Sequence, residues 1–155
     1  QLPGSRVGGY RLLAEILAGC LAADCVGPDG PEKAGRAWGR YLAGRPPLSP
    51  PLSAEASLRT LIALFAEIGF GTEVVDENGR PRVLLRRCPF RAVAKRHDGV
   101  VCTVHLGLVR GALAEFGWRL EVESLSPLAV PNVCALDLRP ADGAGRVAND
   151  RSVER

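Results

Sequence analysis

The stretch from residue 100 to residue 116 constrains the fold more than any other part of this sequence. It reads as one long helix, and Arg110 is its only charge before Glu115. A helix that is apolar on nearly every side must be buried on nearly every side. We therefore expect it to pack on a sheet with one face and on another helix, or on a partner subunit, with the other. Gly107 and Gly111 would let a neighbouring backbone come close.

Three helices are expected in the first 68 residues. Apolar residues at helical spacing occur over residues 10–25 and over residues 53–68, where Ser53 can cap the helix. Between them, residues 31–42 form a helix with a proline in its first turn. Residues 44–52 contain too many prolines for a helix or a central strand and are expected to be a linker.

Beyond the third helix, the apolar period changes from that of a helix to that of a strand. Asn78-Gly79 is a strong signal for the turn of a first hairpin, and a turn with Pro127 and Pro131 joins the strands of a second. A short helix over residues 88–97 separates the first hairpin from the long helix. The expected strands are residues 72–76, 82–87, 118–123 and 133–138.

This order of elements predicts an α+β domain. We expect an antiparallel sheet of about four strands, arranged as two hairpins, with helices packed on one face. A chain of 155 residues has room for one domain, which we place at residues 1–139. Residues 140–155 are polar and rich in glycine, and we expect them to be a disordered tail.

The expected location is the cytoplasm, without contact to a membrane. We find no run of about eighteen apolar residues that would span a bilayer. Residues 1–9 lack the charged start and the apolar run of a signal peptide. Five cysteines with irregular spacing do not look like the disulfide framework of a secreted protein. Free thiols or metal ligands in a reducing compartment fit this pattern better.

Charge and motifs argue against a nucleic-acid-binding surface and against catalysis. The chain has 20 basic and 17 acidic residues, and its arginines at residues 80–87 lie in an expected strand, where a solvated sheet face is the simpler explanation. There are two histidines, His97 and His105, with no nucleophile elbow and no glycine-rich phosphate loop. We expect a protein that is not an enzyme.

Three cysteines and one histidine form a candidate metal site. Cys88 stands at a helix start, where backbone N–H groups and the helix dipole favour a thiolate. Cys102 and His105 are three residues apart on the long helix and project from one side of it. Cys134 points inward from the last strand. Together, or as three thiolates with an open fourth position, they would suit zinc or an iron–sulfur cluster.

The alternative is that these residues are only part of the core. Unpaired cysteine is among the most buried residue types and packs as a small hydrophobe. We assign Cys20 and Cys25 to the core on this ground. Trp38 and Trp118 are expected to be core or the wall of a pocket.

Several sequence blocks resemble a known family of transcription regulators. The specific blocks are LRRCPFR at residues 85–91 and VCTVHLGLVRGAL at residues 101–113. Further similar segments are residues 10–19, 34–40 and 125–135. In these blocks the chain resembles the part that follows the winged helix in arsenic-repressor-like regulators, which are similar to the iron–sulfur-assembly repressors.

This resemblance implies an effector-sensing and dimerisation domain. In its pattern Cys88, Cys102 and Cys134 correspond to cluster cysteines. Residues 116–118 are Phe-Gly-Trp where those repressors place another cysteine, so His105 or a non-protein ligand would complete the site. The resemblance also implies a homodimer and a DNA-binding winged helix that would lie upstream of Gln1, outside this chain.

The leading hypothesis is therefore the regulatory domain of a transcription regulator that senses through a metal or iron–sulfur site. One alternative is an apolar small-molecule receptor, in which aliphatic helices enclose a pocket, a small molecule is the effector and the cysteines are structural. Another is a dimerisation module with no effector.

Overall fold

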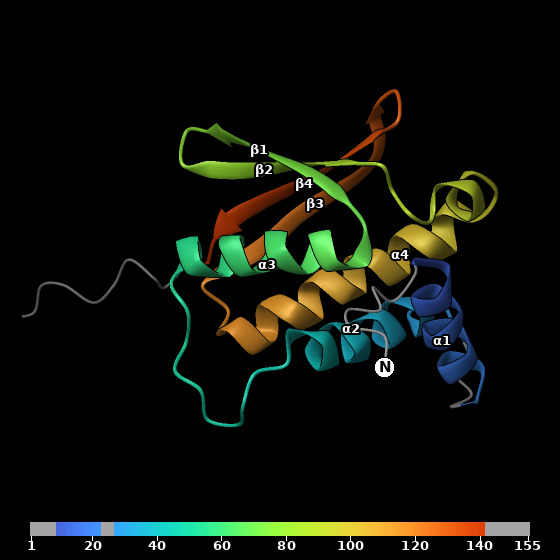
Figure 1. Cartoon of the computed structure of the whole chain (residues 1–155), viewed down its shortest axis with the longest axis horizontal. Helices are drawn as coiled ribbons and strands as arrows, with labels where there is room; N and C mark the ends of the chain where they lie inside the picture. Colours follow the sequence, from blue (N-terminus) through green and yellow to red (C-terminus); the bar gives the residue numbers. More distant parts are fainter. Residues whose placement is uncertain (1–8, 23–26, 142–155) are drawn as a thin grey trace, which may run out of the picture.

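The structure, a computed structural model, describes residues 9–22 and 27–141. Figure 1 shows a sheet with the helices gathered on one side of it. The sheet is antiparallel, and its four strands lie in the order β1-β2-β4-β3. This arrangement confirms the expected α+β class with two hairpins. The elements are α1 (Gly9–Ala22), α2 (Gly30–Ala43), α3 (Ala54–Ile68), β1 (Gly71–Glu77), β2 (Arg80–Arg86), α4 (Arg91–Phe116), β3 (Leu120–Val130) and β4 (Val133–Pro140).

The core lies between the sheet and the helices. Val83 on β2 is paired with Leu136 on β4, so their side chains share a face, and both are fully buried. Phe65 of α3 and Phe116 of α4 are also fully buried and belong to the same apolar cluster. Few of these side chains are aromatic, because aromatic residues are only 5% of the sequence.

The opposite face of the sheet is a network of ion pairs. Arg86 of β2 contacts Glu73 of β1 at 2.8 Å, and Arg82 contacts Asp137 of β4 at 2.5 Å. Arg139 contacts Glu121 across the second hairpin at 3.2 Å. The arginines in this region therefore lie on a solvated sheet face, as expected from the sequence.

Helices α2 and α4 lie in unusually close contact. A Cβ atom built on Gly107 of α4 would lie 2.1 Å from the Glu32 carbonyl oxygen, and one on Gly35 of α2 would lie 2.0 Å from that of Val104. Gly111 and Gly39 are crowded in the same way, one turn further along each helix. The close approach expected at the glycines of α4 is confirmed, and the neighbour is a helix of the same chain.

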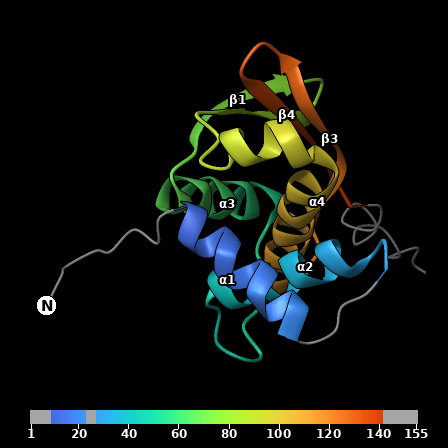
Figure 2. The ribbon, with the colours of Figure 1, turned by 90° about the vertical axis from the view of Figure 1, so that its right-hand side faces the viewer.

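Helix α4 is broken at His97, where φ is −140° and ψ is 46°. Figure 2 shows its first turns running across the direction of the rest of the helix. The two helices expected on either side of residue 97 are therefore present as two arms of α4. By length and composition Gly99–Phe116 is able to cross a membrane, contrary to our expectation that no stretch qualifies. Its packing against α2 and the core gives the same apolar surface a partner within the fold.

Three details differ from the sequence expectations. Strand β3 continues through Pro127 to Val130, because its outer residues pair with β4 beyond a bulge. Trp118 is not core, because it has a positive φ just after the end of α4 and 51% of it is exposed, but it does form part of the wall of a second pocket, as the other expectation had it. Cys20 is disulfide-bonded, so it is not a free packed thiol. Cys25 and the expected tail after residue 141 lie outside the described residues.

Candidate functional site

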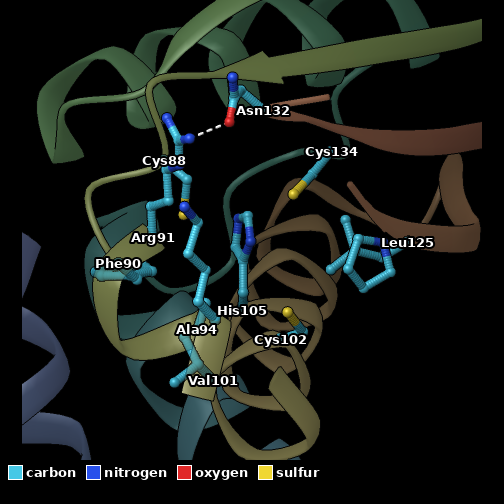
Figure 3. Close-up of a pocket in the computed structure, with 12 residues that line it drawn as sticks. Cys88, Phe90, Arg91, Ala94, Val101, Cys102, His105, Leu125, Asn132 and Cys134 are labelled. Atoms are coloured by element: carbon cyan, nitrogen blue, oxygen red, sulfur yellow. Dashed lines mark hydrogen bonds between the residues drawn. The ribbon is translucent and has the colours of Figure 1, made fainter. Parts of the chain in front are cut away.

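A pocket of about 190 Å³ lies beside the first half of α4 and the second hairpin (Figure 3). It is formed by the segment after β2, both arms of α4, and residues of β3, β4 and the turn between them. Its lining residues are Cys88, Phe90, Arg91, Ala94, Lys95, Val101, Cys102, His105, Leu125, Pro127, Asn132 and Cys134.

All four residues expected to form a site line this one pocket. Cys88 follows β2 directly after Arg87, whose φ of 54° turns the chain away from the sheet. Cys102 and His105 lie three residues apart on the second arm of α4 and therefore face the same side. Cys134 lies on the inner face of β4, opposite Leu85. Residues from three distant parts of the sequence thus meet at one cavity.

These residues surround the cavity and do not converge on one point. In Figure 3 the ring of His105 stands between the side chains of Cys88 and Cys134, and Cys102 lies on another side of the pocket. Among the described residues, no group of three or more His, Cys, Asp or Glu side chains is placed to hold a metal ion. The expected metal centre is therefore not found as a formed site, because a tetrahedral ion needs its ligands within about 2.3 Å of a common centre.

His105 is held in place by aromatic rings. It stacks on Phe70 with 4.8 Å between ring centroids and an interplanar angle of 17°. The rings of Phe65 and Phe90 meet it edge-on, at 5.7 Å and 6.3 Å. Three rings thus pack around the imidazole, which also lines the pocket.

The imidazole is buried without a protein partner for one of its nitrogens. Only 6% of His105 is exposed, and its Nε2 makes no hydrogen bond to the described residues. Burial lowers the pKa of His105 to about 4, so the ring is neutral at physiological pH. A buried polar atom without a partner costs about 1–3 kcal/mol of folding free energy. The protein carries this cost at the wall of its pocket.

Cys88 does not have the thiolate character expected of it. Burial raises the pKa of its thiol above the ordinary value, and the nearby Cys134 acts in the same direction. The Phe90 backbone and the Arg91 guanidinium oppose this effect without overcoming it. The expectation considered only the helix start, whereas desolvation by the surrounding core is the larger influence. Cys88 therefore presents a neutral thiol to the pocket.

The more exposed part of the lining is basic. Lys95 is exposed and Arg91 is half-buried, and neither forms an ion pair with a described acidic side chain. Arg91 donates a hydrogen bond to Oδ1 of Asn132, which joins α4 to the turn after β3. Both cations also border a more open hollow that contains Tyr10 and Arg96.

These polar residues were missed at the sequence level. Arg91 and Lys95 are four residues apart, so they lie on one side of a helix, and this spacing was a usable signal. Asn132 could not have been found in this way. It reaches the pocket only because its positive φ closes the turn between β3 and β4.

The fold and the site together define an α+β domain with a small pocket lined by thiols, an imidazole and two cations. No known family model matches the sequence, and no curated protein matches it. Among solved structures, the chain is similar to a trafficking protein particle complex subunit 3 from Naegleria fowleri, solved covalently bound to palmitic acid. The TM-score is 0.49 at 17% identity, over 88% of this chain and 93% of that one. A likeness at this level assigns neither a function nor a partner to this chain.

The comparison corrects the expected identity. The expectation of a domain from an arsenic-repressor-like transcription regulator is corrected: no family model of such regulators and no curated regulator matches the sequence, and the solved structure that it resembles is titled as a trafficking protein particle complex subunit. The partners that followed from it, DNA through an upstream winged helix and a second regulator subunit, are withdrawn with it. The expected role as an iron–sulfur sensor is withdrawn too. Among the described residues, no cluster of His, Cys, Asp or Glu side chains is placed to hold a metal ion.

The alternative of a receptor with inert cysteines does not describe this pocket either. A sizeable closed cavity lined by leucine and valine, with the three sulfurs far apart, would have favoured it. Here Cys88, Cys102 and Cys134 share one lining with His105. The sulfur atoms are part of the surface that any ligand would touch.

Proposed function

We propose that the chain is a non-catalytic binding domain whose pocket takes a small organic anion. The apolar part of the ligand would contact Phe90, Leu125 and the cysteine side chains, and its negative end would lie at Arg91 and Lys95. The observation that supports this proposal is the composition of the cavity, which joins an apolar interior to two cations that no described acid neutralises. Ligand pockets commonly combine a mostly apolar wall with a few placed polar groups.

The size of the pocket limits the ligand. An enclosed cavity of about 150 Å³ in an unrelated protein holds benzene. The slightly larger volume here, about 190 Å³, therefore suits roughly six to nine non-hydrogen atoms. A short-chain carboxylate such as hexanoate has this size and the required distribution of charge.

Calorimetric titration with hexanoate and with the neutral 1-hexanol tests the proposal. We expect hexanoate to bind one per chain and about ten-fold more tightly than hexanol, because charge-assisted hydrogen bonds contribute about 1.5–3 kcal/mol. The double variant Arg91→Gln, Lys95→Gln should remove this preference. Lys33→Gln, an exposed position on α2 outside the pocket lining, is the matched control and should retain it.

Two results would overturn the proposal. One is the absence of binding by either ligand at millimolar concentration. The other is stoichiometric zinc or iron in anaerobically purified protein, lost when Cys88, Cys102 and Cys134 are replaced together by serine. The expected cofactor, zinc or an iron–sulfur cluster, stays a prediction that this second measurement tests. The expectation that the chain is not an enzyme is part of the proposal, and recovery of the ligand unchanged would support it.

Location in the cytoplasm is likewise retained as a proposal. The cysteines of the pocket are not in disulfides, which suits a reducing compartment, whereas the disulfide at Cys20 does not. Alkylation of the protein inside intact cells, followed by mass spectrometry, separates the two cases. A fully reduced Cys20 would support the cytoplasm, and an oxidised one would exclude it.

A further inference from the structure

The pocket contains one polar group that an anion at the basic rim does not explain. His105 lies on the second arm of α4, is 6% exposed, and borders the cavity with the three thiols. Its Nε2 has no hydrogen-bond partner among the described residues. Nearly all buried polar groups in proteins have a partner. Because His105 lines the pocket, we consider a ligand there as the partner of this nitrogen.

The surroundings of His105 make it suited to recognition. Phe70 stacks on one face of the ring, and the edges of Phe65 and Phe90 also contact it, so the imidazole is packed by three aromatic side chains. A polar group that is fixed in advance and already desolvated gains more from a matching ligand than a mobile one exposed to water. It also rejects ligands that leave it without a partner.

We infer that His105 selects ligands that carry a hydroxyl group on their apolar part, so that the preferred ligand is a short hydroxylated carboxylic acid. A hydroxyl oxygen both donates and accepts hydrogen bonds, so it pairs with Nε2 in either neutral tautomer of the imidazole. A second carboxylate would be disfavoured at this position, because the ring is neutral and apolar side chains surround it. The inference rests on the proposed function and adds to it the class of ligand.

The test compares hexanoate with its derivatives hydroxylated at successive carbons, in the wild type and in His105→Phe. In the wild type we expect the acid hydroxylated at one particular carbon to bind about ten-fold more tightly than hexanoate. Acids hydroxylated at the other carbons should bind no more tightly than hexanoate. In His105→Phe this preference, measured as the ratio of the affinities for the hydroxylated acid and for hexanoate in the same variant, should vanish or reverse. His105→Gln, which keeps a donor and an acceptor, should restore part of the preference.

The possible outcomes separate this inference from the proposed function. If hexanoate binds and the hydroxylated series shows the same affinities in the wild type and in His105→Phe, the inference is wrong and the binding function stands. If no member of the series binds to the wild type, both are wrong. Circular dichroism and the melting temperature of each variant show whether a lost preference reflects a lost fold.

Discussion

At its C-terminal end, helix α4 lies so close to α2 that Gly107 and Gly111 have no room for a Cβ atom, whereas nearer its N-terminus the same helix borders a cavity of about 190 Å³. The first region has backbone against backbone and a shared ion pair between Glu32 and Arg110 at 2.8 Å. The second has a break at His97, three thiols and a buried nitrogen without a protein partner.

This difference separates stability from binding along one element. The α2–α4 contact leaves no space for a ligand and holds the helix at a defined position on the sheet. The pocket region carries the features that cost folding free energy, and natural proteins keep such features where function requires them. The rigid end therefore positions the site, and the open end provides its chemistry. The following predictions test that division, starting with the largest effect.

The largest expected effect is at the glycine contact. Gly111→Ala should lower the free energy of unfolding by roughly 3 kcal/mol, because the new Cβ would lie 2.1 Å from the Arg36 carbonyl oxygen and the helices would have to separate. Gly99→Ala is the matched control on the same helix, with nothing within 4 Å of its Cβ, and should change stability by less than about 1 kcal/mol. Urea denaturation measures both. Equal effects at the two positions would remove the distinction between the two regions.

The second effect is a pH dependence that belongs to the pocket. Burial holds the pKa of His105 at about 4 against 6.5 for an ordinary histidine, so the unfolded chain binds a proton that the folded chain does not. Its contribution to stability is complete above pH 6.5 and is lost as the pH falls toward 4. We expect a loss of about 3 kcal/mol between these values, at about 1.4 kcal/mol per pKa unit. Urea titrations at pH 7 and pH 4.5 give the free energy of unfolding of the wild type and of His105→Phe. This free energy should fall more between the two pH values in the wild type than in the variant. An equal fall in both would show that His105 is not the titrating group.

A third effect has the opposite sign. At pH 7, His105→Phe should raise the free energy of unfolding by about 1 kcal/mol, because it removes a buried nitrogen without a partner and keeps a ring against Phe70. Thermal melting without ligand measures this gain. A gain in stability together with a loss of hydroxyl preference is the signature of a binding residue. A clear loss of stability would show that the imidazole is needed for the fold.

The smallest expected change in stability is at the ion pair between Glu32 of α2 and Arg110 of α4. The hydrogen bond from Arg110 is the main reason that the pKa of Glu32 is lowered in the folded protein. The Glu32 carboxylate therefore stabilises the fold at a pH above its pKa in the unfolded chain. This stabilisation is lost as the pH falls through its pKa in the folded protein. The pair is partly exposed, so Glu32→Gln should cost about 1 kcal/mol or less at pH 7. Glu55→Gln, in the exposed pair with Arg59, is the control and should cost still less. A double-mutant cycle with Arg110 measures the contribution of the ion pair itself.

Much of the fold was predictable because its signals are local. Alternating residues in the hairpins and the cap at Ser53 correspond to features that the structure shows. The end of β3 was not predictable in this way, because Pro127 reads as a turn residue and only pairing with β4 keeps this stretch in the sheet. Trp118 failed for a related reason. The alternating pattern predicted a strand from residue 118, but the strand begins at Leu120, because Gly117 and Trp118 both have a positive φ at the end of α4.

The site was predictable as a set of residues and not as an arrangement. The spacing of Cys102 and His105 placed them on one side of a helix, and strand alternation turned Cys134 inward. Neither signal fixes how far apart the sulfur atoms lie, and that distance decides between a metal centre and a pocket. It depends on the turn at Arg87 and on the packing of two hairpins against α4.

The amino-acid sequence by itself determined the α+β class, the burial of the long apolar helix and the candidate residues, because periodicity and composition act over short stretches of chain. Only the tertiary structure decided that α2 is the neighbour of the α4 glycines, that burial keeps Cys88 neutral, and that His105 has no protein partner for Nε2. The reason is that packing distance, desolvation and hydrogen-bond satisfaction depend on atoms from elements far apart in the sequence.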